Sequence, residues 1–323
     1  MRTASLPEEL QRYVDDRLAG RGPTALRRSA GKLSARYRDV AGAGPVAVDA
    51  DAVDAYAATR LPATYAAVAT ALDELHRIAF APVSQLDLGT GLGSAVWAAA
   101  EAFPSLRRVT AVDAVAGMLT AAAEAAARGP APVRATAFAA ADLARFVPDG
   151  RYDLVTAGYV LNELPEATAG ALLERVWPAT TGALVLVEPG TPPSYARVMA
   201  LRDRLLALGA TILAPCPHDG PCPLRGGDDW CHFAVRLSRS AAHRAAKGAR
   251  RGFEDEKFTY LVATRDADAG RGLPRVLRHP LVRPGHVRFR LCTPDGIAET
   301  TVGRSDRGYR AARKASWGDR LGS

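Results

Sequence analysis

The chain has 323 residues, of which 48% are apolar and 24% are charged, as in an ordinary soluble globular protein. This composition excludes disorder throughout the chain, and no apolar run reaches the roughly 18 residues of a membrane-spanning helix. The N-terminal stretch MRTASLPEELQRYVDD carries early acids and no continuous apolar segment, so we expect no secretory signal, no membrane association and a cytoplasmic location.

The net charge of +8 is unevenly distributed. Residues 233–323 contain 20 Lys and Arg against 9 Asp and Glu, whereas residues 1–232 have a net charge of −3. A basic segment of this size suits a polyanion, and nucleic acid is the first candidate. The alternative is a surface that only keeps the protein soluble.

Apolar residues recur at spacings of three and four in residues 6–80, which predicts a helical N-terminal module over residues 1–80. From residue 82 the pattern changes to short apolar runs that alternate with helical stretches. Strands are expected at 83–90, 107–114, 133–142, 152–164 and 182–190, with closing strands at 230–237 and 257–265. Such alternation predicts an α/β fold with a doubly wound, largely parallel sheet.

This second unit is expected to span residues 81–265, with a Pro-, Gly- and Cys-rich insert at 214–233. Residues 266–323 form a basic C-terminal extension, in which 287–304 contain short β-like pieces. We expect the tail from residue 309 to be flexible.

A glycine-rich loop directly follows the first strand of the sheet and opens a helix. It reads Asp87-Leu88-Gly89-Thr90-Gly91-Leu92-Gly93, and glycines let backbone N–H groups approach a ligand closely. Asp113 ends the next strand, where a carboxylate can accept hydrogen bonds from ribose hydroxyls. The spacing differs from the Gly-x-Gly-x-x-Gly pattern of dinucleotide-binding proteins, because Ser94 occupies the last position.

The Asp-x-Gly-x-Gly-x-Gly pattern resembles that of class I S-adenosylmethionine-dependent methyltransferases. The resemblance implies that the three glycines line the methionine end of the ligand, that Asp113 holds the ribose, and that Asp142 reaches the adenine amine. The alternative is a vestigial nucleotide fold that binds nothing. No catalytic residue is assigned, because the segment 157–163 lacks an Asn/Asp-Pro-Pro-aromatic motif and the fourth and fifth strands lack a cysteine. Asn162 and Glu163 either cap the following helix or bind the cofactor.

The four cysteines are candidate metal ligands, since thiols in a cytosolic chain seldom form disulfides. Five residues separate Cys216 from Cys222, eight separate Cys222 from Cys231, and sixty separate Cys231 from Cys292. No Cys-x-x-Cys pair is present, so this is not an ordinary zinc ribbon. An iron–sulfur cluster, a zinc ion held with help from His218 or His232, and no metal at all remain open on spacing alone.

Several segments together resemble the methyltransferase-like small-ribosomal-subunit assembly family. They are AYAATRLPATYAA, LDLGTGLG, GYVLNELP, LVEPGTP, PCPHDGPCPL, DWCHF and FEDEKFTYLVATR. The resemblance covers roughly residues 30–295. It implies a four-iron four-sulfur cluster held by Cys216, Cys222, Cys231 and Cys292, and binding to small-subunit ribosomal RNA or to the maturing small subunit. The mitochondrial location of some members is not carried over.

Three functions follow from these observations. The first is an S-adenosylmethionine-dependent ribosomal RNA methyltransferase with a structural iron–sulfur cluster. The second is a non-catalytic, RNA-binding ribosome-assembly factor, and the third is a small-molecule methyltransferase with a zinc-stabilised insert. In the first two functions, we expect the cluster to link the insert at 214–233 to the downstream segment that carries Cys292, and thereby to order a basic surface. That surface would carry His232, Arg236, Arg239, Arg244, Lys247, Arg250 and Arg251.

Overall fold

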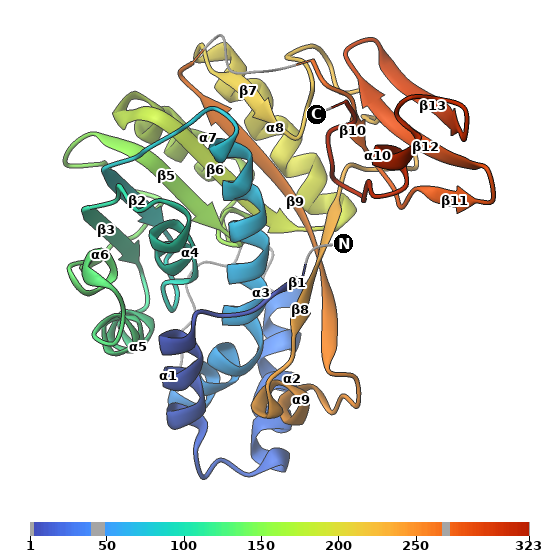
Figure 1. Ribbon diagram of the computed structural model, residues 1–323. Helices are drawn as coiled ribbons and strands as arrows, with labels where there is room; N and C mark the ends of the chain where they lie inside the picture. Colours follow the sequence, from blue (N-terminus) through green and yellow to red (C-terminus); the bar gives the residue numbers. More distant parts are fainter. Residues whose placement is uncertain (1–2, 40–48, 267–271, 323) are drawn as a thin grey trace.

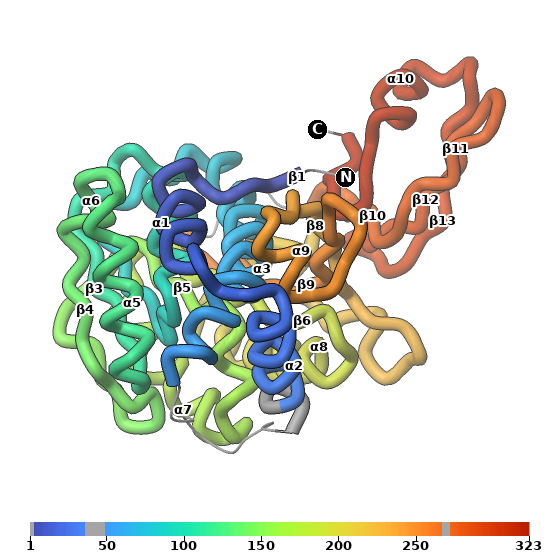
Figure 2. The backbone as a smooth tube through the Cα atoms, turned by 90° about the horizontal axis from the view of Figure 1, so that it is seen from below, coloured from blue at the N-terminus to red at the C-terminus, as the bar shows by residue number. Residues whose placement is uncertain are grey.

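The computed structural model describes residues 3–39, 49–266 and 272–322. A mixed β-sheet covered by helices forms the body of the molecule, and a smaller antiparallel sheet stands out from it at the C-terminal end (Figures 1 and 2). Among the helices in the described part of the chain, none has both the length and the apolar character that a bilayer span requires.

The large sheet has the strand order β1-β8-β9-β6-β5-β2-β3-β4, and β7 also pairs with β9. Its strands are β1 (Thr3–Ala4), β2 (Ser84–Leu88), β3 (Arg108–Asp113), β4 (Ala137–Ala140), β5 (Tyr152–Gly158), β6 (Thr180–Pro189), β7 (Thr211–Ala214), β8 (Phe233–Ser238) and β9 (Phe253–Thr264). Strands β4, β3, β2, β5 and β6 run parallel, and β9 is antiparallel to β6. This is the class I methyltransferase topology, so the predicted fold class is confirmed.

Helices cover both faces of this sheet, which explains why its central strands are buried on both sides, polar residues included (Figure 1). All five residues of β2 are buried, for example. The helices of the body are α3 (Ala50–His76), α4 (Ser94–Ala102), α5 (Ala116–Ala126), α6 (Ala131–Arg134), α7 (Glu166–Val176), α8 (Pro192–Ala207) and α9 (Ala241–Lys247), with single 3-10 turns η1 (Leu161–Glu163) and η2 (Trp177–Ala179). Helix α3 is apolar on nearly all sides, because it packs between the sheet and the other N-terminal helices.

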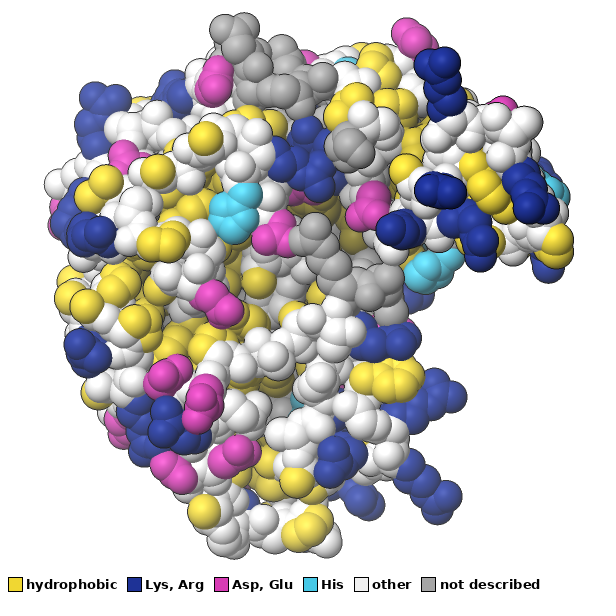
Figure 3. Space-filling model, viewed as in Figure 1, with side chains coloured by type: hydrophobic (Ala, Val, Ile, Leu, Met, Phe, Trp, Pro, Cys, Tyr) yellow, Lys and Arg dark blue, Asp and Glu magenta, His cyan; other side chains and the backbone are white. Residues whose placement is uncertain are grey.

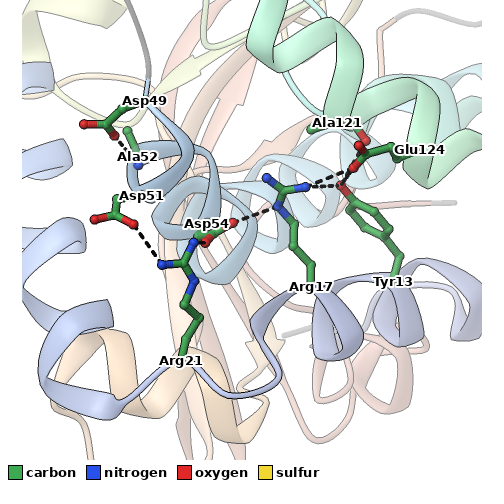
Figure 4. A network of polar contacts seen from close by, with 9 residues as sticks. All are labelled: Tyr13, Arg17, Arg21, Asp49, Asp51, Ala52, Asp54, Ala121 and Glu124. Carbon is green, nitrogen blue, oxygen red and sulfur yellow. Dashed lines mark hydrogen bonds and ion pairs between the residues drawn. The ribbon is translucent and has the colours of Figure 1, made fainter.

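The N-terminal helices are tied to the body by polar contacts as well as by packing (Figure 4). Helix α1 (Glu8–Leu18) precedes α2 (Pro23–Asp39). Arg17 pairs with Asp54 on α3 at 2.8 Å and with Glu124 on α5 at 3.0 Å. Strand β1 pairs with the outer edge of β8, with Thr3 opposite Arg236. One continuous hydrophobic core therefore includes both α1 and the sheet.

The C-terminal sheet contains β10 (Arg275–Val276), β11 (Leu281–Arg283), β12 (His286–Thr293) and β13 (Gly296–Gly303), followed by α10 (Tyr309–Ala312). Alternate residues of β12 point to opposite faces, so Val287, Phe289 and Leu291 are buried against Ala312 in a small second core.

The expectation of a flexible tail is wrong, because the tail is hydrogen-bonded back to this sheet. Val276 N donates to Asp319 O at 2.9 Å, and Leu321 N donates to Pro274 O at 2.8 Å. Strands β1 and β7 were not expected from the sequence, and the third expected strand is shorter because the one-turn helix α6 occupies its first residues.

Candidate functional site

The glycine loop lies between β2 and α4, where the strand order of the sheet reverses direction, as ligand sites of open α/β sheets do. Gly89, Gly91 and Gly93 have φ values of +65°, +53° and +83°, which side chains other than glycine rarely adopt. A Cβ at Gly89 would overlap the Val160 side chain, and one at Gly91 would lie 2.8 Å from the Tyr56 hydroxyl. The loop therefore needs glycine for both its conformation and its close packing.

Asp113, at the end of β3, is hydrogen-bonded to the backbone of this loop. Its Oδ2 accepts a hydrogen bond from Gly91 N at 2.8 Å, and its Oδ1 accepts one from Val115 N at 2.9 Å. Burial raises the pKa of this carboxyl, and the two N–H donors act against that rise. Each carboxylate oxygen has two lone pairs, so Asp113 keeps acceptor capacity for a ligand hydroxyl.

The other two predicted acids differ in burial. Asp87 is buried in β2 beneath the loop and accepts a hydrogen bond from Thr156 Oγ1 at 2.7 Å, and burial raises its pKa to about 6. Asp142 is exposed after β4, where its Oδ1 accepts a hydrogen bond from Ala144 N at 2.9 Å.

Two further acids lie at the same edge of the sheet. Glu188, near the end of β6, is fully buried, and its Oε1 accepts a hydrogen bond from Leu161 N at 2.9 Å. Its Oε2 has no hydrogen-bond partner among the described residues, and burial raises its pKa to about 8. Burial, together with the charge of Asp113, raises the pKa of Glu163 to about 7.

Asn162 and Glu163 do not cap the following helix, because α7 begins after Pro165 and receives no side-chain cap. The Asn162 Oδ1 atom is buried and has no partner among the described residues. The sequence had not identified Glu188, although its place in the segment LVEPG at the end of a strand was a usable signal. These acids make the edge beside the glycine loop suited to a cationic ligand.

A second candidate site is formed by the four cysteines, all of which are free thiols. Cys216 and Cys222 follow β7, Cys231 precedes β8, and Cys292 lies on β12 in the other sheet. Burial and the charges of Cys216, Cys222 and Cys292 raise the pKa of Cys231. Burial and the charges of Cys216 and Cys222 raise that of Cys292 to about 12. The structure thus brings together the four thiols that are far apart in the sequence.

The spacing of these thiols bears on which metal they suit. In the described part of the chain, no three His, Cys, Asp or Glu side chains are placed to hold one metal ion. The ligands of a single tetrahedral zinc all contact the same ion, whereas the four thiolates of a cubane each bind a different iron and so lie farther apart.

Two buried arginines fix the loop that carries Cys216 and Cys222. Arg202 on α8 donates to His218 O at 3.0 Å and to Gly220 O at 2.8 Å. Arg275 on β10 pairs directly opposite Cys292 and donates from Nε to Pro215 O at 3.0 Å. Both guanidinium groups lower the pKa of Cys216, which burial raises.

Aromatic side chains join the insert to the C-terminal sheet. The ring of Trp230 stacks on His232 at 4.8 Å, and His232 meets Trp317 edge-on at 4.9 Å. Asp229 forms ion pairs with Arg278 and, at 3.3 Å, with Arg290. Since His232 is buried in this stack, the expectation that it contributes to a basic surface is wrong.

Other members of that expected basic surface are paired with acids. Arg239 and Lys247 contact the Glu254 carboxylate at 2.8 and 3.0 Å, and the neighbouring His243, which was not part of that set, contacts it at 3.1 Å. Arg236 forms two hydrogen bonds to Asp255, at 2.7 and 2.9 Å. Cross-strand acids thus neutralise much of this basic set, while Arg250 and Arg251 remain exposed.

A family model described as mitochondrial small ribosomal subunit Rsm22 matches residues 50–322. The chain belongs to the Rsm22 family. The match begins at the first residue of α3 and includes both candidate sites. The family resemblance inferred from the sequence is therefore confirmed.

The chain is similar in sequence to two proteins whose names include the word mitochondrial. The human ribosome assembly protein METTL17, mitochondrial, is 33% identical over 287 residues, which are 82% of this chain and 61% of the human protein. Rsm22-cox11 tandem protein 2, mitochondrial, of Schizosaccharomyces pombe is 25% identical over 54% of this chain and 30% of its own length. The chain thus spans less than two thirds of these relatives.

Among solved structures, the chain is similar to the magnesium protoporphyrin IX methyltransferase of Synechocystis PCC 6803 with bound SAH. The TM-score is 0.42 and the sequence identity 16%, over 76% of this chain and 99% of that chain.

Proposed function

We propose that this protein is a small-subunit ribosome-assembly factor that binds S-adenosylmethionine at the glycine loop, contacts small-subunit ribosomal RNA and carries a four-iron four-sulfur cluster. The observation that carries the proposal is an intact glycine loop with its surrounding acids, in a member of a family named for the small ribosomal subunit. The four thiols suit a reducing compartment, and we keep the cytosol as the expected location.

The residues around the glycine loop fit the chemistry of S-adenosylmethionine. This ligand carries a positive sulfonium group and would supply a methyl group when bound. Gly89, Gly91 and Gly93 would face its methionine end, Asp113 its ribose and Asp142 its adenine. Glu163 and Glu188 would place negative charge near the sulfonium, because a cation favours the ionised form of a nearby carboxyl.

Methyl transfer is the second candidate activity, and Glu163 is the observation that favours it. Its pKa of about 7 would let it exchange a proton near neutral pH, as a general base must. Asn162 lies beside it, and its amide oxygen, which has no partner among the described residues, could orient an acceptor. The alternative is a binding-only fold whose ligand stabilises the protein.

Cys216, Cys222, Cys231 and Cys292 would hold the cluster, as the resemblance to the family implies. When bound, a cluster would supply covalent links from the insert to β12 across a sixty-residue gap. Arg202 and Arg275 would offset the negative charge of four thiolates. This role is structural: it would keep the C-terminal sheet fixed against the body, so that less ordering is needed when RNA binds.

A deletion strain tests the assembly function. We expect it to accumulate immature small-subunit particles on a sucrose gradient and to recover with the intact gene. Mapping of ribosomal RNA modifications in the same strain then separates the two candidates. A methyl group that is missing in the deletion strain and returns with the intact gene but not with Gly91→Val would establish catalysis. Recovery of assembly with the intact gene, with no change in methylation between the strains, would establish a binding-only factor. Normal particles in the deletion strain would overturn the proposal.

A further inference from the structure

An arginine-lined groove of about 930 Å³ lies on the C-terminal sheet, away from both sites described above. One wall is formed by the end of β11, which carries Arg283, and by the turn that leads to β12. The other wall runs from the end of β13 through α10 and carries Arg304, Arg307, Arg310 and Arg313. A hydrogen bond from Arg304 N to Gly285 O, at 2.8 Å, ties the two walls together.

The spacing of the arginines follows from the backbone. They occur at every third residue from 304 to 313, in the turns that follow β13 and in the short helix α10, which contains Arg310. Ala312 packs in the small core of the sheet, and Tyr309 packs against that core while also lining the groove. Packing of Ala312 and Tyr309 on the core thus fixes the segment whose arginines line the groove.

These arginines lack internal partners. No hydrogen bond or ion pair to any of the five guanidinium groups occurs within residues 3–39, 49–266 and 272–322, and all five are exposed. The single acid of the groove, Asp306, uses its Oδ2 to accept a hydrogen bond from Gly303 N at 2.7 Å. By contrast, Arg288 and Arg290 on β12 pair with Glu299 and Asp229.

Five like charges around one concavity repel one another unless an anionic partner compensates them. Figure 3 shows Lys and Arg side chains gathered on the C-terminal sheet and again below it, on both sides of a hollow at the right of the molecule. The segment joining β8 and β9, which carries the exposed Arg250 and Arg251, lies in the lower part of the molecule in Figure 1.

We propose that this groove binds the sugar–phosphate backbone of a folded RNA. The inference rests on the proposed function and assigns its RNA contact to the C-terminal arginines rather than to the β8–β9 surface. A guanidinium group can donate two parallel hydrogen bonds to the oxygens of one phosphate group. Several arginines at a fixed spacing can therefore bind successive phosphates of a nucleic-acid backbone. A concave groove accepts a ridge such as a nucleic-acid backbone, whereas a membrane presents a broad, flat surface.

Binding of a small-subunit ribosomal RNA fragment to the full chain, measured by fluorescence anisotropy over a salt series, tests this assignment. The test variant is Arg307→Gln/Arg310→Gln/Arg313→Gln. The matched control is Arg28→Gln/Arg134→Gln/Arg151→Gln, which removes the same charge from exposed arginines on α2, on α6 and before β5. Arg283→Gln, on the opposite wall, provides an independent single variant.

We expect the test variant to bind at least about tenfold more weakly near 0.1 M salt and to reduce the slope of log K against log salt by about two units. The control should change affinity less than about twofold. Equal affinities of test and control variants would overturn the groove assignment while leaving the proposed function in place. Absence of RNA binding by the wild-type protein would overturn both. Loss of binding to anionic vesicles or an acidic peptide, with RNA binding unchanged, would assign the groove to another polyanion and also overturn the inference.

Discussion

Arg275 and Glu74, which are 201 positions apart in the chain, form a buried bidentate ion pair. Arg275 Nη1 donates to Glu74 Oε1 at 2.7 Å, and Nη2 donates to Oε2 at 3.2 Å. The same guanidinium group donates to Pro215 O and Gly318 O. One side chain therefore joins α3, the cysteine insert, the C-terminal sheet and the tail.

Replacing Arg275 by Met should destabilise the protein by about 3 kcal/mol, because it leaves the Glu74 carboxylate buried without its main partner. Tyr260 and Arg320 also contact Glu74, which keeps the loss at the lower end of the range for such pairs. Urea unfolding measures this change. Arg288→Met, which breaks an exposed pair with Glu299, is the control and should cost less than about 1 kcal/mol. Equal losses for the two variants would contradict the role of Arg275.

Glu188 should make stability depend on pH. Its pKa rises from an ordinary value of 4.5 to about 8 in the folded protein, because the carboxyl is buried. Between those values the folded state binds more protons than the unfolded state, so this group's contribution to stability falls as pH rises through the window. Glu188→Gln should therefore be more stable than wild type at pH 8, by about 1–3 kcal/mol, and similar to it near pH 4.5.

The measurement is the urea midpoint at several pH values from 4.5 to 8.5. Glu166→Gln, an exposed first-turn position of α7, is the matched control and should leave the profile unchanged. An identical pH profile for wild type and Glu188→Gln would show that Glu188 titrates normally.

Gly91→Ala should weaken S-adenosylmethionine binding by at least tenfold. The new methyl group meets the Tyr56 hydroxyl in a backbone conformation with φ of +53°, and the strain costs about 1–2 kcal/mol. Isothermal titration calorimetry measures the binding. Gly150→Ala, where an added Cβ meets nothing within 4 Å, should bind like wild type. Unaltered binding by Gly91→Ala would place the ligand elsewhere.

Cys292→Ser should lose bound iron, acid-labile sulfide and visible absorbance after anaerobic purification, because a cubane needs all four thiolates. Removal of iron from wild type by a chelator should lower the thermal midpoint, since a metal that binds only the folded state stabilises it. Thr293→Ser, one residue away, keeps its hydroxyl hydrogen bond to Gly296 O and should retain iron. Wild-type protein containing one zinc and no iron would refute the cluster.

Local patterns in the sequence predicted the parallel strands, the glycine loop and the acids Asp87 and Asp113, because these features depend on neighbouring residues. The closing strands β8 and β9 were found for the same reason. Strands β1 and β7 were not, since two and four residues carry no usable periodicity and owe their conformation to the strands beside them.

Properties that depend on distant contacts could not be predicted. The burial of the Glu74 and Glu188 carboxyl groups follows from packing between separate elements, and the ordered tail depends on contacts with Pro274, Val276 and Arg275. The basic set around Arg239 looked free because its acidic partners lie on the neighbouring strand. The arginine at every third residue from 304 was visible in the sequence, and that regularity was the signal that could have identified the groove.

The short strand β1 has a consequence for solubility. An unpaired strand edge is a template on which another chain can add, and β8 would offer such an edge if Thr3 and Ala4 did not occupy it. Among the described residues, Thr3 and Ala4 cover this edge, so a change that releases them would expose an edge that can recruit extended peptides, including copies of this chain.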